Sequence, residues 1–228
     1  MKHFVLLVLF LVFIPGFTHA GEIILEPDPS AVYYALLDVD GFTDWDSARN
    51  YSGTITRPPQ AEETFSTVRS DKNSGFYRIY RASIPFAVPE LPDGAEIISA
   101  ELGLYKRFIG NDGGVELYIT EHQRVSQTSP VREDWNINNF VGQQLAGPVS
   151  LIDNEYTIIE LNGDLSDLLS KDWLVVGILT NFDFEDTDPG TIKRNASWYR
   201  STPSEPDRGP FLRIEYELNT SVIGVPVN

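Results

Sequence analysis

The stretches GFYRIYRASIPF, residues 75–86, and LPDGAEIISAELGLY, residues 91–105, decide the fold of this chain. Apolar side chains occupy every second position within them, at Tyr80, Ala82, Ile84, Ala100, Leu102 and Leu104. Charged Arg81 and Glu101 stand between these positions. A period of two is that of a β-strand with one face on the core and the other in water. Both stretches therefore predict strands, with Arg81 and Glu101 on the solvent face.

Short segments of the same kind follow one another along the chain, and no dozen residues carry a sustained helical stripe. Strands are predicted at residues 22–26, 32–38, 53–57, 64–69, 77–86, 97–106, 115–122, 156–161, 173–182, 197–201 and 211–217. Stretches rich in Pro, Gly and Asp predict loops at residues 38–59, 123–148 and 183–194. So many strands favour an all-β antiparallel sandwich of two sheets.

Two segments depart from the simple alternation. Residues 173–182 are apolar on both faces up to Leu179, which predicts a central position for this strand in its sheet. Residues 162–169 predict a helical turn, with Asp164 or Ser166 as its cap.

The N-terminal segment has the layout of a secretory signal peptide over residues 1–20. Lys2 precedes an unbroken apolar run at residues 4–14, and Thr18 and Ala20 supply small side chains at the cleavage site. The run is shorter than the roughly 20 residues that a membrane-spanning helix needs, although a short membrane anchor is the alternative. Cleavage after Ala20 predicts a secreted protein without a membrane span, with the periplasm and the cell surface as alternative locations.

Composition bounds the mature chain further. Residues 21–218 suffice for a single β-sandwich domain, followed by a short tail at residues 219–228. The chain has no cysteine, so a hydrophobic core and not disulfides must stabilise it. It carries 17 Lys and Arg against 33 Asp and Glu, a formal net charge of −16, and the loss of Lys2 makes this more negative by one. That charge repels phosphates at long range, which argues against nucleic acid as a partner.

Residues 64–218 resemble the DNRLRE domain, also called carbohydrate-binding module family 96. The resemblance is carried by the two opening strands with the Leu-Pro-Asp-Gly turn at residues 91–94, by WLVVGILT at 173–180, and by the closing stretch WYRSTPSEPDRGPFLRIEY at 198–216. It implies a jelly-roll-like β-sandwich that is exported and often attached to polysaccharide-acting enzymes or cell-surface proteins.

The residues for catalysis are scarce. His3 and His19 leave with the signal peptide, so His122 is the one possible histidine base, and we expect it on the surface at the end of a strand. The chain has no G-x-S-x-G, no glycine-rich phosphate loop before a helix and no H-E-x-x-H. The sequence therefore predicts that this protein is not an enzyme. Paired carboxylates of a glycoside hydrolase stay open as an alternative, because the acids are numerous.

Sugar binding needs flat aromatic faces and planar hydrogen-bonding groups on a rigid surface. Tyr105 and Tyr118 lie out of phase with the apolar positions of their strands, so we expect them to face solvent or a covering loop. The candidate ligand-binding residues are Tyr105, Tyr118, Arg81, Arg107, Trp198 and Tyr199, with the loop residues Trp45 and Trp135 behind them. Ordinary packing under a loop is the alternative for these aromatics, and Trp173 is expected in the core.

Two acidic clusters are candidate metal sites. Asp38, Asp40, Asp44 and Asp46 place carboxylates at intervals around Gly41, which suits a structural Ca²⁺ ion. The second cluster comprises Asp183, Glu185, Asp186 and Asp188. Solvated acidic turns are the alternative in both places.

The first functional interpretation is a secreted, non-catalytic carbohydrate-binding or cell-surface-associated module, whose partner is a polysaccharide or a cell-surface glycan. The second is a structural extracellular protein, an adhesin or appendage subunit, with protein partners in an assembly. The third is a small polysaccharide-acting enzyme, a lyase or glycoside hydrolase.

Overall fold

A computed structural model describes residues 19–27, 33–38, 42–51, 55–57, 65–107, 114–124, 131–191, 194–199 and 206–218. The strands are β1 His19–Leu25, β2 Tyr33–Asp38, β3 Ile55–Arg57, β4 Phe65–Asn73, β5 Phe76–Ala87, β6 Ala95–Tyr105, β7 Leu117–Glu121, β8 Gln143–Val149, β9 Tyr156–Glu160, β10 Trp173–Thr180, β11 Arg194–Tyr199 and β12 Phe211–Leu218. The helices are α1 Trp45–Asn50, α2 Leu165–Leu169 and α3 Asn181–Phe184, and 3-10 turns are η1 Arg132–Trp135, η2 Ile137–Asn139 and η3 Pro206–Arg208.

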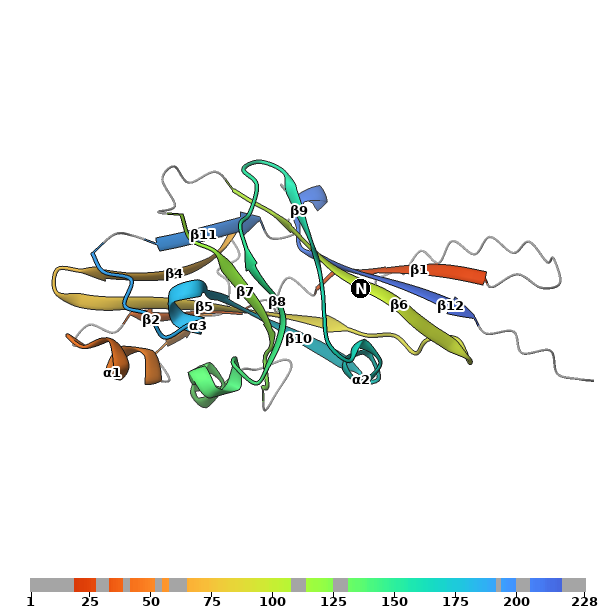
Figure 1. Cartoon of the computed structure of the whole chain (residues 1–228), viewed down its shortest axis with the longest axis horizontal. Helices are drawn as coiled ribbons and strands as arrows, with labels where there is room; N and C mark the ends of the chain where they lie inside the picture. The colour runs from red at the N-terminus through yellow and green to blue at the C-terminus, as the bar shows by residue number, and fades with distance from the viewer. Residues whose placement is uncertain are drawn as a thin grey trace, which may run out of the picture.

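The strands form two antiparallel sheets, which confirms the predicted β-sandwich. The smaller sheet has the order β1-β12-β6-β9, and the larger one has the order β11-β4-β5-β10-β7-β8, with β2 and β3 joined to it through β5. The sheets overlap in the middle of an elongated molecule, with the β4–β5 hairpin at one end and β1, β6 and β12 reaching toward the other (Figure 1). β10 lies between β5 and β7, so its predicted central position is confirmed.

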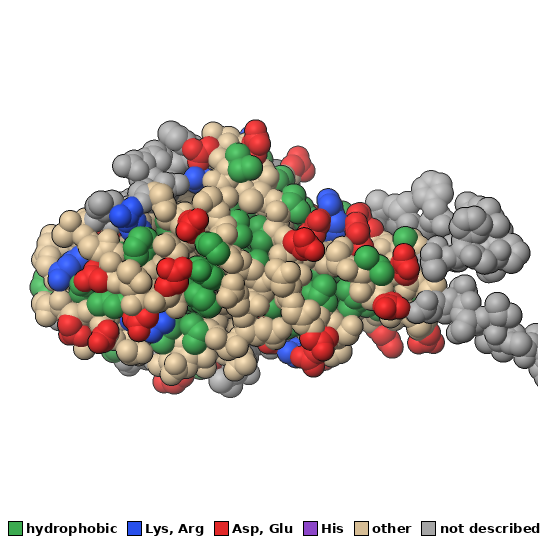
Figure 2. Space-filling view, viewed as in Figure 1, with side chains coloured by type: hydrophobic (Ala, Val, Ile, Leu, Met, Phe, Trp, Pro, Cys, Tyr) green, Lys and Arg blue, Asp and Glu red, His purple; other side chains and the backbone are tan. Residues whose placement is uncertain are grey.

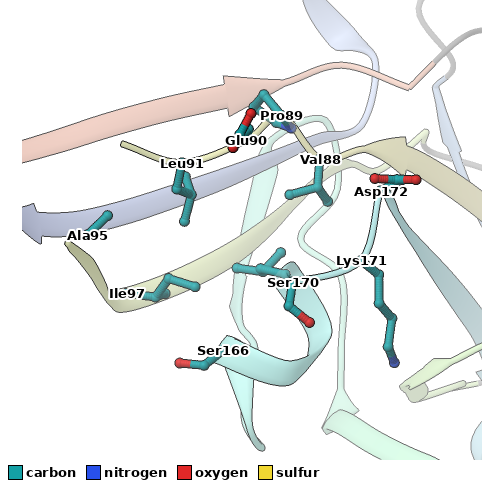
Figure 3. Close-up of a pocket in the computed structure, with 11 residues that line it drawn as sticks. Val88, Pro89, Glu90, Leu91, Ala95, Ile97, Ser166, Ser170, Lys171 and Asp172 are labelled. Carbon is teal, nitrogen blue, oxygen red and sulfur yellow. The ribbon is translucent and has the colours of Figure 1, made fainter. Parts of the chain in front are cut away.

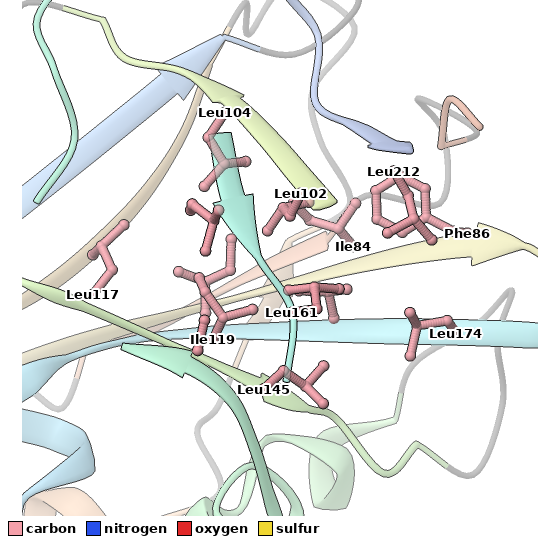
Figure 4. Close-up of a cluster of buried hydrophobic side chains, with 14 of the residues drawn as sticks. Ile84, Phe86, Leu102, Leu104, Leu117, Ile119, Leu145, Leu161, Leu174 and Leu212 are labelled. Carbon is pink, nitrogen blue, oxygen red and sulfur yellow. The ribbon is translucent and has the colours of Figure 1, made fainter. Parts of the chain in front are cut away.

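The main core fills the space between the sheets. Figure 4 shows Leu102, Leu104 and Leu212 of the smaller sheet facing side chains such as Ile84 and Ile119 of the larger one. These are the residues that the period-two pattern assigns to the inner face, and all are fully buried. The alternation therefore predicted correctly which side of each strand meets the core.

A second buried cluster covers the outer face of the larger sheet. Side chains from α1, from η1, η2 and the residue that follows, from β5 and from β10 pack together there. Its buried members are Trp45, Ala48, Tyr77, Ile79, Trp135, Ile137, Phe140 and Leu179. β5 and β10 are therefore buried on both faces, and we call this group the outer cluster.

The outer cluster overturns the expectation that Arg81 faces solvent. Arg81 is fully buried, and its Nε and Nη2 bond both carboxylate oxygens of Asp183 at 2.7 and 2.9 Å. Nη1 donates to Trp135 O, and Nη2 also donates to Arg49 O at 2.7 Å. A polar position in an alternating strand looks the same in sequence whether it meets water or a buried polar layer, and here α1, α3 and η1 supply that layer.

The predicted loops contain structure that the sequence pattern missed. α1 lies within residues 38–59, and β8 lies mostly within 123–148, where two glutamines, Gly147 and Pro148 obscure its alternation. β10 ends at Thr180, short of the predicted 182, because the Thr180 hydroxyl accepts from Asp183 N and caps α3. The predicted turn at 162–169 is confirmed as α2, and Asp164 is its cap.

Gly177 of β10 makes room for the outer cluster. A Cβ at this position would lie 2.7 Å from Phe140 Cδ1 and 2.7 Å from Thr120 Oγ1. We expect Gly177→Ala to lower the free energy of unfolding by about 1–3 kcal/mol, because extra volume in a packed core forces strain. Urea titration of the original protein and of the Gly177→Ala variant measures the change. Gly75→Ala would be a poor control, because the positive φ of Gly75 makes any side chain there strained. The control is Ala196→Gly, which removes volume at another buried strand position. Comparing the two variants shows whether any change of volume at a buried strand position lowers the free energy of unfolding as much as Gly177→Ala does.

The termini bear on the predicted leader and tail. Residues 1–18 and 219–228 lie outside the described residues, so the signal peptide and the tail stay predictions. β1 includes His19 and Ala20, which the predicted cleavage removes, while Gly21–Leu25 still pairs with β12. Among the described residues no helix has the length and apolarity needed to cross a bilayer.

Candidate functional site

The outer face of the smaller sheet carries a group of aromatic rings. Leu102 and Leu104 of β6 point into the core, so Gly103 and Tyr105 fall on the outer face. The strand register sets Tyr156 of β9 opposite Tyr105 and Phe211 of β12 opposite Gly103. The sequence thus places rings from three neighbouring strands on one surface.

The rings contact one another edge to face. Ring centroids lie 5.1 Å apart for Tyr105 and Tyr156, and 5.3 Å apart for Tyr156 and Phe211. Tyr199 of β11 joins from the larger sheet, 5.7 Å from Tyr105, where Lys106 and Trp198 form a β-bridge between the sheets. All four rings are half-buried. We call Tyr105, Tyr156, Tyr199 and Phe211 the aromatic platform.

Gly103 lets the Phe211 ring lie across β6. A Cβ at residue 103 would lie 2.2 Å from Phe211 Cε1, closer than any real contact. A larger residue would therefore displace the ring from the sheet. The position of the Phe211 ring in the platform therefore depends on this glycine.

Planar charged and polar groups surround the rings. The Arg208 guanidinium lies over the Tyr105 ring, 5.1 Å from its centroid, and over the Tyr199 ring, 5.3 Å from its centroid. Arg213 lies 5.7 Å from the Phe211 centroid and bonds Glu101 at 3.0 Å. These groups offer both donors and acceptors to a ligand lying on the rings.

The Tyr156 hydroxyl is held by the backbone. It lies 2.9 Å from both Asp207 O and Gly209 O and shares its one proton between these carbonyls, which ties β9 to η3 and the residues after it. Burial, followed by nearby Glu26 and Asp207, raises the pKa of Tyr156 above its ordinary value. The ring is thereby fixed in orientation.

The structure brings together part of the predicted site. Tyr105, Tyr199 and Arg107 lie where β6 meets β11, and Arg107 N donates to Ser197 O at 2.9 Å. Trp198 is fully buried in the main core, so it offers no face to a ligand. The other candidates, Tyr118 and Arg81, lie on the larger sheet and take no part.

Tyr118 meets the covering segment and not solvent. Its ring stacks on Phe184 of α3 with centroids 4.1 Å apart, and its hydroxyl donates to Glu185 Oε1 at 2.6 Å. This hydrogen bond and burial raise the pKa of Tyr118 to about 12. The side chain is 8% exposed, which matches the packing alternative. Trp45 and Trp135 are likewise buried, and Trp173, expected in the core, is half-buried at the start of β10.

Sequence reasoning missed Tyr156, Phe211 and Arg208. Parity alone marks the first two as outward, because Tyr156 is out of phase with Ile159 and Phe211 with Leu212. Nothing local in the sequence shows that these rings meet. Their meeting depends on the register of three strands from distant parts of the chain.

The acidic cluster after β10 is paired within the protein. Asp183 bonds Arg81, Asp186 accepts from Trp45 Nε1 at 3.0 Å, and Asp188 accepts from the Tyr77 hydroxyl and from Gly190 N. Glu185 accepts from Tyr118, as described above. These four carboxylates therefore join α1, β5 and β7 to the segment that follows β10.

The first acidic cluster is only partly described. Asp44 caps α1 by accepting from Ser47 N at 2.8 Å, and hydrogen bonds from the Ser47 side chain and then from its backbone lower the pKa of Asp44, while Asp46 is exposed in the first turn. Asp40 and the side chain of Asp38 lie outside the described residues. Within the described part of the chain, no three Asp, Glu or His side chains gather closely enough to hold a metal ion. Calcium binding stays a prediction.

His122 lies in the interior, so its predicted surface position is wrong. Nδ1 lies 2.8 Å from Ser83 Oγ, Nε2 lies 2.7 Å from Asp134 O, and the ring stacks on Phe140. Ser83, His122 and Asp134 are all buried, and the Asp134 carboxylate accepts from Val131 N. His122 Nε2 contacts the backbone carbonyl of Asp134 and not its carboxylate, which distinguishes Ser83 and His122 from a nucleophile–histidine–acid triad.

The molecular surface is acidic. Asp and Glu side chains are spread over the face seen in Figure 2, with few Lys and Arg among them.

Comparison with known proteins identifies no family for this chain. No protein-family model and no curated protein matches the chain, so the resemblance to the DNRLRE domain stays a prediction. Among solved structures, the chain is similar to "Structure of infectious bursal disease virus Gx strain", with a TM-score of 0.26 and 10% identity. The similarity covers 92% of this chain and 40% of that viral chain, so this chain spans less than half of its length.

Proposed function

We propose that this is an exported, non-catalytic protein that binds carbohydrate on the aromatic platform. The observation that carries the proposal is the set of three half-buried rings on the outer face of the smaller sheet, joined by the half-buried Tyr199 ring of β11, with arginine side chains at the rings. Aromatic faces stack on the C–H surfaces of sugar rings, and planar guanidinium groups bond the hydroxyls. An open sheet face suits a polymer chain, which extends beyond any single cavity.

We expect Tyr105→Ala to weaken polysaccharide binding about tenfold, since the loss of one aromatic stacking contact removes about 0.5–1.5 kcal/mol beyond the area it buries. Gly103→Val tests the same surface independently, because it displaces Phe211 without deleting any ring. Binding is measured by a glycan array and by pull-down on insoluble polysaccharides, with and without a calcium chelator. The chelator arm also tests the predicted Ca²⁺ site.

Phe76→Ala is the matched control. Phe76 is an exposed aromatic residue, 38% accessible, in the β4–β5 hairpin far from the platform. It should leave binding unchanged. Absence of retention on every glycan, or equal loss in the Phe76 variant, would contradict the proposal. Release of reducing ends from a bound glycan would instead favour the polysaccharide-acting enzyme.

A structural extracellular protein is the second candidate, because exposed isoleucines lie on the same face as the platform. Ile24 is 51% exposed and Ile158 is 44% exposed, on outward positions of β1 and β9. Apolar side chains of this kind suit a protein contact. Sedimentation velocity at increasing concentration distinguishes the two, since assembly that Ile158→Ser abolishes would favour the structural role.

A further inference from the structure

Glutamate side chains lie beside the aromatic platform on the outer face of the smaller sheet. They are Glu22 of β1, Glu101 of β6, Glu160 of β9 and Glu215 of β12. Each is the chain neighbour of a residue that packs in or on the main core, in the same order Ile23, Leu102, Ile159 and Ile214. Side chains alternate across a strand, so the four glutamates face outward. Arg213 is the one Lys or Arg in these four strands.

The outward glutamates oppose one another in pairs. The strand register sets Glu101 opposite Glu160, and Glu22 opposite Glu215. Like charges directly opposite each other destabilise a sheet. Arg213 offsets part of this repulsion, because it lies 3.0 Å from Glu101 and 3.5 Å from Glu22. Its charge is therefore engaged within the sheet, and the outer face retains an excess of carboxylates.

These carboxylates adjoin the rings along the strands. Glu101 lies two residues from Gly103, across which the Phe211 ring lies, and two residues of an antiparallel strand span about 7 Å. Arg213 joins both groups, since it bonds Glu101 and its guanidinium lies over the Phe211 ring, 5.7 Å from the centroid. A sugar chain on the Phe211 ring therefore comes within reach of the carboxylates.

Carboxylates are also present at the other end of the platform. Asp207 is exposed, and its carbonyl oxygen accepts from the Tyr156 hydroxyl. After burial, the charges of Glu26 and Asp207 raise the pKa of Tyr156. Arg208 supplies a positive charge at this end, next to Asp207 in the chain. The rings thus lie between acidic groups at both ends.

We propose that these carboxylates make the platform select neutral polysaccharides and exclude acidic ones, which rests on the carbohydrate binding proposed above. Sugar hydroxyls donate to carboxylates and accept from guanidinium groups, so a neutral chain finds partners of both kinds. A uronate or sulfate group would instead meet Glu101, Glu160 and Asp207 at close range. The net charge of −16 adds repulsion at longer range.

A groove at the end of the sandwich is an alternative place for a ligand (Figure 3). It has a volume of about 480 Å³ and lies between α2 and the segment that follows β5. Val88 and Ile97 of its lining pack on the main core, so the groove and the platform lie on opposite sides of the smaller sheet. Ser170 lines the groove and is exposed, so Ser170→Trp fills it without contacting the platform.

Frontal affinity chromatography tests the selection. The columns carry immobilised polysaccharide, either neutral (β-glucan, xylan or galactomannan) or acidic (alginate or polygalacturonate). They are run at about 10 mM salt, where charges act over about 30 Å. The original protein should be retained by a neutral polysaccharide and not by an acidic one. Tyr105→Ala should lose most of the neutral retention, whereas Ser170→Trp should keep it.

Glu160→Lys tests whether the selection arises beside the platform. The substitution replaces a repulsion across β6 and β9 with an attraction, so the fold tolerates it. It should raise the affinity for an acidic polysaccharide about two- to tenfold, because one like charge is lost and an opposite one is gained. Glu133→Lys is the matched control. It changes the net charge by the same amount at an exposed position of η1, over the larger sheet, and should give no such gain.

Three results would overturn the proposal. Equal retention on acidic and neutral columns would remove the selection and leave carbohydrate binding intact. Equal gains in the Glu160 and Glu133 variants, or no gain in either, would show that the glutamates beside the platform do not cause the selection. Retention on no column, or loss of retention in Ser170→Trp and not in Tyr105→Ala, would overturn the binding platform and the selection with it.

Discussion

Arg81→Met is expected to lower the free energy of unfolding by about 3–5 kcal/mol, the usual cost of leaving a buried charge without its partner. The Arg81 and Asp183 side chains are 0% and 1% exposed, and the guanidinium also holds the carbonyls of Arg49 and Trp135. Removing it leaves the Asp183 carboxylate with only the longer ion pair to Arg49, at 3.7 Å, and leaves two backbone acceptors short of donors in the interior. Urea titration at pH 7 measures the change.

Two further variants isolate the buried charge as the cause. The double variant Arg81→Met, Asp183→Leu removes both charges and should recover much of the lost stability. Lys171→Met breaks a more exposed ion pair with Glu121, and should cost only about 0–1 kcal/mol. A single Arg81 variant as stable as the Lys171 variant would show that the pair does not stabilise the outer cluster.

Acid should destabilise the protein through His122 before the carboxylates begin to titrate. Burial, with a smaller contribution from Arg124 and Arg81, lowers the pKa of His122 to about 3 from an ordinary value of 6.5. Between these values the unfolded chain binds a proton that the folded protein does not. Stability is therefore constant with respect to this group above pH 6.5 and falls as pH decreases toward 3, by about 3 kcal/mol at pH 4.

Urea titrations at pH 7, 5.5 and 4.5 measure this slope, and His122→Gln supplies the comparison. Glutamine does not titrate, so the variant should lose less stability on acidification even though it is less stable at pH 7. The lowered pKa values of Asp44 and Asp188 act in a lower window, because their stabilisation is lost only as pH falls below about 4. Parallel slopes for the two proteins would show that His122 is solvated and titrates normally.

Alternation in the sequence predicted most of the strands, though not β8, and the inner face of the sandwich, because period-two burial is a local property. It failed at Arg81 and His122, since both meet segments that come from elsewhere in the chain. α1, η1 and α3 close over the larger sheet, and their own sequences show only short polar stretches. Within β5, the local sign of such a cover is that Tyr77 and Ile79, which share the parity of Arg81, carry largely apolar side chains.

In the candidate site too, local alternation predicted some features, while contacts between distant segments determined the others. Parity identified Tyr105 as outward, and the sequence also put forward Tyr199. Tyr156 and Phe211 obey the same parity, but their proximity follows from pairing across β6, β9 and β12. Trp198 was also put forward from the sequence, but it lies next to Tyr199 with its side chain in the main core and not at the site.

The burial of β5 and β10 on both faces couples the two hydrophobic clusters during unfolding. Each strand is a shared wall, so side chains above and below it lose their support together when either strand separates from its neighbours. The outer cluster and the main core should therefore unfold as one cooperative unit, even though they are separate clusters on opposite faces of the larger sheet. A chain without cysteine gains its resistance to partial opening from that arrangement.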